Sequence, residues 1–91
     1  MREITIERNP AKEKLAELGV SSWPIWEKVS STSDWTYDED ETCYLLEGKV
    51  RVEPAEGKAV EFSAGDLVTF PKGMSCVWKI ASAVRKHYRF G

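Results

Sequence analysis

The chain has 91 residues, of which 42% are hydrophobic and 31% are charged, a composition typical of one soluble globular domain. Its net charge is −2, and the 13 basic and 15 acidic residues are mixed along the sequence, so the basic surface that nucleic-acid binding requires is missing. No apolar run reaches the length of a membrane helix. We therefore expect a single domain over residues 1–91, with neither nucleic acid nor a membrane as its partner.

The first third of the chain predicts a strand, a short helix and an edge strand. Alternation over residues 2–7 is typical of a strand with one apolar face. Asn9 suits the start of a helix, and Gly19 suits its left-handed end. Residues 23–29 contain a proline, which cannot donate a ladder hydrogen bond, so we expect an edge strand there. Residues 30–34 are polar and predict a connection.

From residue 35 onward the sequence predicts short strands separated by turns. Glycine, proline and small polar residues recur between apolar segments at nearly even intervals, which is typical of an antiparallel sandwich or barrel. The predicted strands cover residues 42–46, 49–53, 59–62, 67–70, 76–80 and 84–90.

The alternation within these strands assigns side chains to faces. Glu41 shares an apolar face with Cys43, and Lys86 lies on the apolar face of the last strand. His87 falls on the opposite face, and it turns inward only if a bulge shifts the register. An inward carboxylate is costly unless it is paired or protonated. Glu41 is therefore expected either to pair with Lys86 or an arginine, or to act as a general acid or base.

Two motifs resemble those of the cupin superfamily. Glu41 and Gly48 keep the spacing of the glutamate and glycine in the first cupin motif, and Gly65, Pro71 and Gly73 keep that of the second. The resemblance implies an all-β fold, an antiparallel cupin β-barrel or jelly roll with one short N-terminal helix. The segments 23–26, 69–73 and 85–88 are also similar to the small single-domain cupins related to the (S)-ureidoglycine aminohydrolase cupin domain. That group implies a homodimer.

The resemblance fails at the metal ligands. In a metal-binding cupin, three histidines and one glutamate hold the ion, and the corresponding positions here are Trp35, Tyr37 and Cys76, with Glu41 alone retained. A longer spacing of the first motif would put Asp34 and Thr36 there instead. We therefore expect a degenerate metal site and no cofactor. A noncanonical divalent metal held by Glu41, Cys76 and Tyr37 is the alternative.

Three functions follow as hypotheses. The first is a cupin that binds a small polar organic molecule in its barrel, in a pocket lined by Trp35, Tyr37, Cys43, Trp78, Lys86 and His87. The second is an enzyme like ureidoglycine aminohydrolase, acting on a small nitrogen-containing or carbonyl compound, with Glu41 as acid or base and Cys76 as a second catalytic residue. The third is a dimeric interaction module.

The cysteine content bears on the compartment. Two cysteines in a small chain without a signal-peptide core predict free thiols in a reducing compartment. We expect the cytoplasm, or an organelle if a targeting segment has been removed.

Overall fold

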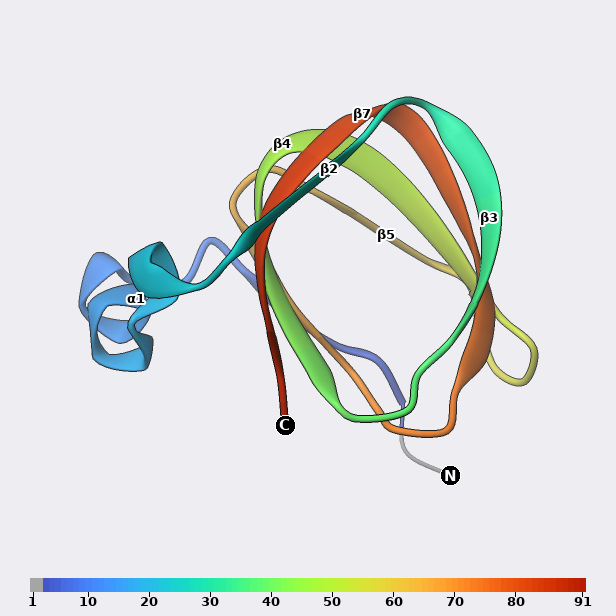
Figure 1. Ribbon diagram of the computed structural model, residues 1–91, viewed down its shortest axis with the longest axis horizontal. Coiled ribbons are helices and arrows are strands. Elements are labelled where there is room, and N and C mark those ends of the chain that lie inside the picture. The colour runs from blue at the N-terminus through green and yellow to red at the C-terminus, as the bar shows by residue number, and fades with distance from the viewer. Residues whose placement is uncertain (1–2) are drawn as a thin grey trace.

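Two long strands form the frame of the structure. In the computed structural model, which describes residues 3–91, β4 (Glu41–Pro54) and β7 (Ser75–Phe90) pair antiparallel and curve together around a common interior (Figure 1). Because both strands bend, each one contributes side chains to two sides of the barrel.

Five shorter strands complete the barrel, and every pairing between strands is antiparallel. The main order is β1-β6-β4-β7-β2, while β5 pairs with β4 and β3 pairs with β7. Their bounds are Thr5–Arg8 for β1, Ile25–Lys28 for β2, Ser31–Thr36 for β3, Val60–Ser63 for β5 and Asp66–Phe70 for β6. This arrangement confirms the predicted antiparallel β-barrel with one short helix near its N-terminus.

Three local predictions differ from the structure. The predicted strands 42–46 and 49–53 are one strand, β4, because register shifts between Leu45 and Val50 absorb the irregularity that the sequence presents as a turn. Residues 81–83 likewise lie within β7 rather than in a turn. The polar segment 30–34 contributes to β3, whose small polar residues pair with β7.

The N-terminal region agrees with the sequence in outline. Helix α1 (Lys12–Leu18) ends at Gly19, whose φ of 71° is the predicted left-handed conformation. The N-cap of the helix is Ala11, which makes no side-chain capping hydrogen bond, so Asn9 is not the cap. A short 3₁₀ helix, η1 (Val20–Ser22), follows, and none of the residues of α1 is buried. The first predicted strand includes Arg2, which lies outside the described residues, and the observed strand is β1.

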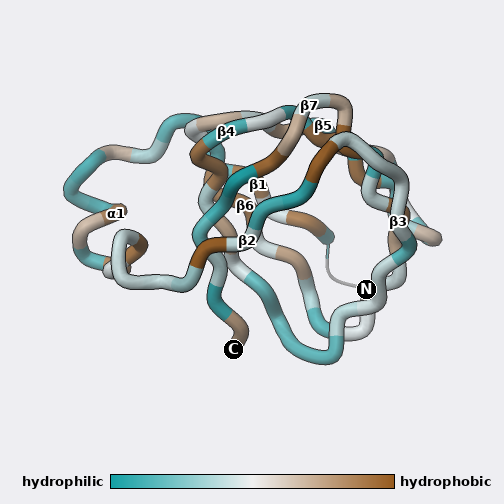
Figure 2. The backbone as a smooth tube through the Cα atoms, turned by 45° about the horizontal axis from the view of Figure 1, so that its top comes forward, coloured by the Kyte–Doolittle hydropathy of each residue, from teal (hydrophilic) through white to brown (hydrophobic). Residues whose placement is uncertain are grey.

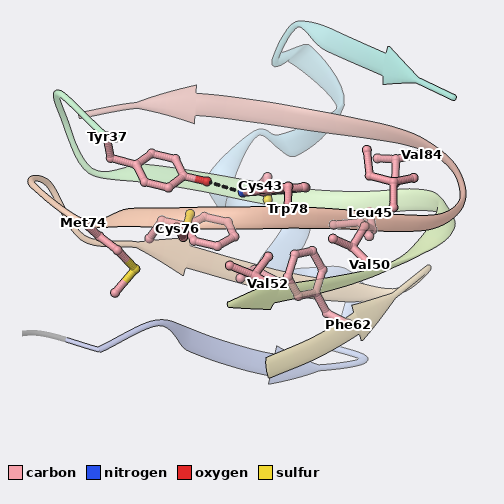
Figure 3. Close-up of a cluster of buried hydrophobic side chains, with 13 residues drawn as sticks. Tyr37, Cys43, Leu45, Val50, Val52, Phe62, Met74, Cys76, Trp78 and Val84 are labelled. Carbon is pink, nitrogen blue, oxygen red and sulfur yellow. Dashed lines mark hydrogen bonds between the residues drawn. The ribbon is translucent and has the colours of Figure 1, made fainter. Parts of the chain in front are cut away.

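The inner side of the barrel is filled by alternate side chains, and hydrophobic and hydrophilic residues follow one another along the strands in Figure 2. Aromatic rings occupy its centre. Tyr37 stacks on Phe70 with 4.9 Å between ring centroids, and Phe62 packs edge-on against Trp78 at 5.6 Å. In Figure 3, Phe62 lies beside Val50 and Val52 of β4, which belong to the same buried cluster. The core therefore fixes the inner face of β7, on which the candidate site is built.

No helix within residues 3–91 is long and apolar enough to cross a membrane.

Candidate ligand-binding cavity

A cavity of about 250 Å³ lies between β2, β3 and the inner face of β7, and it is partly open to solvent. Most of its wall is aromatic. The rings come from the strands and from the loop after β3, and they belong to Trp26, Trp35, Tyr37, Trp78, Tyr88 and Phe90. An aromatic wall with a few polar groups is the usual construction of a small-molecule site.

The charged centre of the cavity is an ion pair between Lys86 and Glu41. The Lys86 ammonium donates a hydrogen bond to Glu41 Oε2 at 2.8 Å. The two residues are only 5% and 4% exposed. Both occupy inward-facing positions on the neighbouring strands β7 and β4, so the alternation of each strand brings them together. At this depth each charge compensates the other, because an unpaired buried charge would be strongly destabilising.

The Lys86 ammonium also lies between two indole rings. Its Nζ atom is 4.9 Å from the ring centroid of Trp26 and 4.6 Å from that of Trp78. Both distances allow cation–π attraction. An ammonium has three donor hydrogens, and Glu41 is the one hydrogen-bond acceptor that the described residues offer to Lys86. The amine therefore keeps donor capacity for a molecule in the cavity.

A second cation contributes to the same cavity. Lys28 lines it from β2 and donates a hydrogen bond to Ser33 Oγ at 2.9 Å. Two lysines against one glutamate leave the lining with one net positive charge. The field inside the cavity therefore favours a ligand that carries an anionic group.

The structure brings five of the predicted site residues together. Glu41, Trp35, Tyr37, Trp78 and Lys86 all line the cavity. The Trp78 indole donates from Nε1 to the Tyr37 hydroxyl at 3.0 Å, and Figure 3 shows the two side chains pointing toward one another. Trp35 is 51% exposed, so its ring forms part of the rim.

The two cysteines do not line the cavity, contrary to the prediction of Cys43 as a pocket residue. Cys76, which was predicted as a second catalytic residue, also lies outside the lining. Cys43 is 0% exposed and lies on β4 between Val68 and Tyr88 of the adjacent strands. Cys76 belongs to the same buried apolar cluster as Cys43. Inward orientation, which alternation predicts, is thus not the same as access to the cavity.

His87 also lies away from the cavity, contrary to its prediction as a pocket residue. It follows Lys86 on β7 and therefore points to the opposite face, where it donates from Nδ1 to the Trp23 carbonyl at 2.8 Å. The register shifts of β7 against β4 occur before Lys86 is reached, opposite residues 45–50 of β4. No bulge is left to turn His87 inward.

Six further residues of the lining were not predicted from the sequence: Trp26, Lys28, Ser33, Ile80, Tyr88 and Phe90. Trp26 and Lys28 share one face of β2, and their pairing opposite Lys86 and Val84 aims that face at the interior of the barrel. The spacing of Trp26 and Lys28 shows that they share a face. It does not show that this face points inward, because the strand with which an edge strand pairs cannot be read from the sequence.

We expect both thiols to resist modification in the folded chain. The thiolate is the reactive form of cysteine, and burial raises the pKa of Cys43 to about 12 and raises that of Cys76 as well. At about pH 8, an aromatic disulfide reagent should therefore react slowly with the native chain and fully after unfolding in urea. Cys43→Ala should leave one reactive thiol in urea, and rapid reaction of native Cys76 would contradict this account.

The side chains at the cupin ligand positions do not fit a divalent metal. Burial, with the nearby Glu41 charge, raises the pKa of Tyr37, so its hydroxyl stays protonated and accepts the Trp78 hydrogen bond. Trp35 has no metal-binding atom, and Cys76 lies outside the cavity. The Lys86 ammonium itself occupies the cation position beside Glu41. Within residues 3–91, His, Cys, Asp and Glu form no group of three that could hold an ion.

Comparisons with known proteins place these features in a family. The profile of the EutQ-like cupin domain matches residues 15–88. A DUF861 family protein from Thermotoga maritima, known from its crystal structure, is 56% identical in sequence to this chain. The match covers 98% of this chain and 100% of that protein, and the two structures superpose with a TM-score of 0.94. No curated protein matches the chain.

Two EutQ structures are more distant relatives. The Clostridium difficile EutQ protein is 30% identical over 70% of this chain, with a TM-score of 0.64. A putative ethanolamine utilization protein Q from Salmonella typhimurium is 31% identical over 70% of this chain, again with a TM-score of 0.64. The matched region spans 50% and 51% of these two proteins, so each has about as much chain again outside it.

Proposed function

This chain belongs to the EutQ-like cupin domain family, and from that premise we propose that its barrel binds a small organic molecule with an anionic group in the aromatic cavity. One observation carries the proposal. The Lys86–Glu41 ion pair lies at the wall of a cavity rather than in solid core, with its ammonium between the faces of Trp26 and Trp78. A core that needed only stability would be served as well by apolar side chains at these positions.

The size and charge of the cavity restrict the ligand. Its volume of about 250 Å³ is just below the range of about 300–1,000 Å³ that drug-sized ligands occupy, so the ligand is a small metabolite. The aromatic wall favours a planar or apolar body, and the two lysines favour a carboxylate or a similar anion. A zwitterion also satisfies the site, since Glu41 can face its cationic end.

A matched set of three probes tests the proposal. Benzoate, benzyl alcohol and benzylamine share a ring and differ in charge, and their binding can be followed through the indole N–H signals of Trp26, Trp35 and Trp78 in NMR spectra. We expect benzoate to bind most tightly and benzylamine least, because the cavity lining has a net positive charge. Replacing Lys86 by methionine should weaken benzoate binding by about tenfold or more, the effect of losing one charge-assisted hydrogen bond.

Lys79→Met is the control for that variant. Lys79 lies on the same strand but pairs with Glu53 on the outer surface, so its loss should leave benzoate binding unchanged. Equal affinities for all three probes would refute the anionic preference. A failure of every probe to shift the indole signals would refute ligand binding in the cavity.

The second candidate function is an enzyme of the ureidoglycine aminohydrolase type, acting on a small nitrogen-containing or carbonyl compound. The observation in its favour is Glu41, a buried carboxylate that lines the cavity. Its Oε2 atom is 2.8 Å from Lys86 Nζ, close enough for proton transfer between the two groups. Release of ammonia from (S)-ureidoglycine by the wild-type chain, and its loss in Glu41→Gln, would support this role. Full activity of that variant would exclude it.

A further inference from the structure

Among residues 3–91, Lys86 is the one amine that is both buried and placed at the wall of the cavity. We infer that it is a nucleophile that forms an imine with a small carbonyl compound, of the 2-oxo acid class, bound there. The inference rests on the proposed function, because the carbonyl compound must first enter the cavity. It goes beyond that function in assigning a covalent step to a named atom, Lys86 Nζ.

Burial is the feature of its surroundings that favours Lys86 as a nucleophile. An amine becomes a good nucleophile in an apolar pocket, where the charged form loses its hydration. Here the apolar surroundings are the ring faces of Trp26 and Trp78, at 4.9 and 4.6 Å from Nζ. Lys79 on the same strand differs, since its side chain is 48% exposed and pairs with a surface glutamate.

Glu41 provides the proton acceptor that such a step requires. Only the free amine attacks a carbonyl carbon, so the ammonium must first lose a proton. Glu41 Oε2 accepts it along the existing hydrogen bond of 2.8 Å. Transfer of this proton removes both buried charges at once, so the step leaves no uncompensated charge in the cavity wall.

The step balances without any other reactant. Nζ attacks the carbonyl carbon, the C–N bond forms as the carbon–oxygen π bond breaks, and the oxygen takes the proton that Glu41 holds. The nitrogen then returns a proton to Glu41, which passes it to the new hydroxyl group. Water leaves, the carbon–nitrogen double bond forms, and Glu41 is again a carboxylate. The products are one protonated imine and one water molecule.

The product keeps the interactions of the free site. A protonated imine is a cation, so it pairs with Glu41 and lies between Trp26 and Trp78 as the ammonium does. Lys28, in the same cavity, offers a second positive charge to the carboxylate of a 2-oxo acid. The site is therefore complementary to the adduct in charge at both ends.

Reductive trapping tests the inference. The wild-type chain is incubated with pyruvate and cyanoborohydride, which reduces imines to stable amines, and the modified lysines are identified by peptide mass spectrometry. We expect Lys86 to be modified at least about tenfold faster than Lys79, because burial and Glu41 activate it. Glu41→Gln should slow trapping at Lys86 by about 10²-fold, the usual size of a lost acid–base catalyst.

A binding measurement separates the two proposals. Glu41→Gln removes the negative charge of the cavity, so noncovalent binding of pyruvate, read from the indole signals without reductant, should be kept or strengthened while trapping falls. Modification spread over surface lysines without preference for Lys86, with pyruvate or benzoate still bound, would overturn the imine alone. If neither anion binds, the proposed function fails as well. The relative rates of modification of Lys86 and Lys79 in the wild-type chain test the imine even if the variant does not fold.

Discussion

Replacing Lys86 by methionine is expected to lower the free energy of unfolding by about 3–5 kcal/mol, as measured by urea denaturation, because it leaves the Glu41 carboxylate charged and unpaired at 4% exposure. Glu41→Leu should have an effect of similar size, since it leaves the ammonium without its partner. A domain of this length has a total stability of only about 5–14 kcal/mol. Either change therefore removes a large share of what keeps the chain folded.

The double variant Glu41→Leu with Lys86→Met discriminates between two explanations. If the single losses come from an orphaned charge, removing both charges should restore most of the stability, because apolar residues often replace a buried ion pair without loss. If they come from lost packing, the two effects should add.

The surface pair of Lys79 with Glu53 provides the control. Its side chains are 48% and 35% exposed, and Lys79→Met should leave the urea midpoint nearly unchanged, as solvent screens such pairs. An equal loss from Lys79→Met and Lys86→Met would show that burial of the ion pair does not determine its contribution.

The inward faces of the strands were predictable from the sequence, and with them the ion pair and part of the aromatic wall of the candidate site. Alternation alone places Glu41, Trp78 and Lys86 inside the barrel, because a strand whose other face meets solvent has only one way to bury its apolar side chains. The pairing of Glu41 with Lys86 was therefore foreseeable. What alternation could not separate is an inward side chain in solid core, such as Cys43, from one that borders a cavity.

The remaining parts of the site depend on which strands become neighbours. Trp26 and Lys28 reach the cavity because β2 lies along the second half of β7, a contact between residues about sixty positions apart in the sequence. That β4 and β7 are each one continuous strand could not be predicted for a related reason. A bulge keeps a strand paired through residues that resemble a turn, and the paired partner that reveals it is distant in the chain.

Gly48 lies at the register shift between β4 and β7. Gly48→Ala is expected to lower the free energy of unfolding by about 3 kcal/mol or more. Its φ of 106° is strained for a residue with a side chain. A Cβ atom there would also lie 2.6 Å from the carbonyl oxygen of Ala83 and 2.9 Å from Cα of Val84. Both atoms belong to the backbone of β7, so relief requires moving a central strand of the barrel.

Gly57→Ala separates the backbone strain from the steric clash with β7. Gly57 has nearly the same φ, 110°, but a Cβ atom would meet nothing within 4 Å. It should therefore show the conformational strain alone, about 1 kcal/mol. The excess loss in Gly48→Ala then measures how closely β4 and β7 approach at the bulge, and equal losses for the two variants would show that β7 shifts freely there. Because β7 also carries Lys86 and Trp78, a shift of that strand should also alter the indole signals of the cavity.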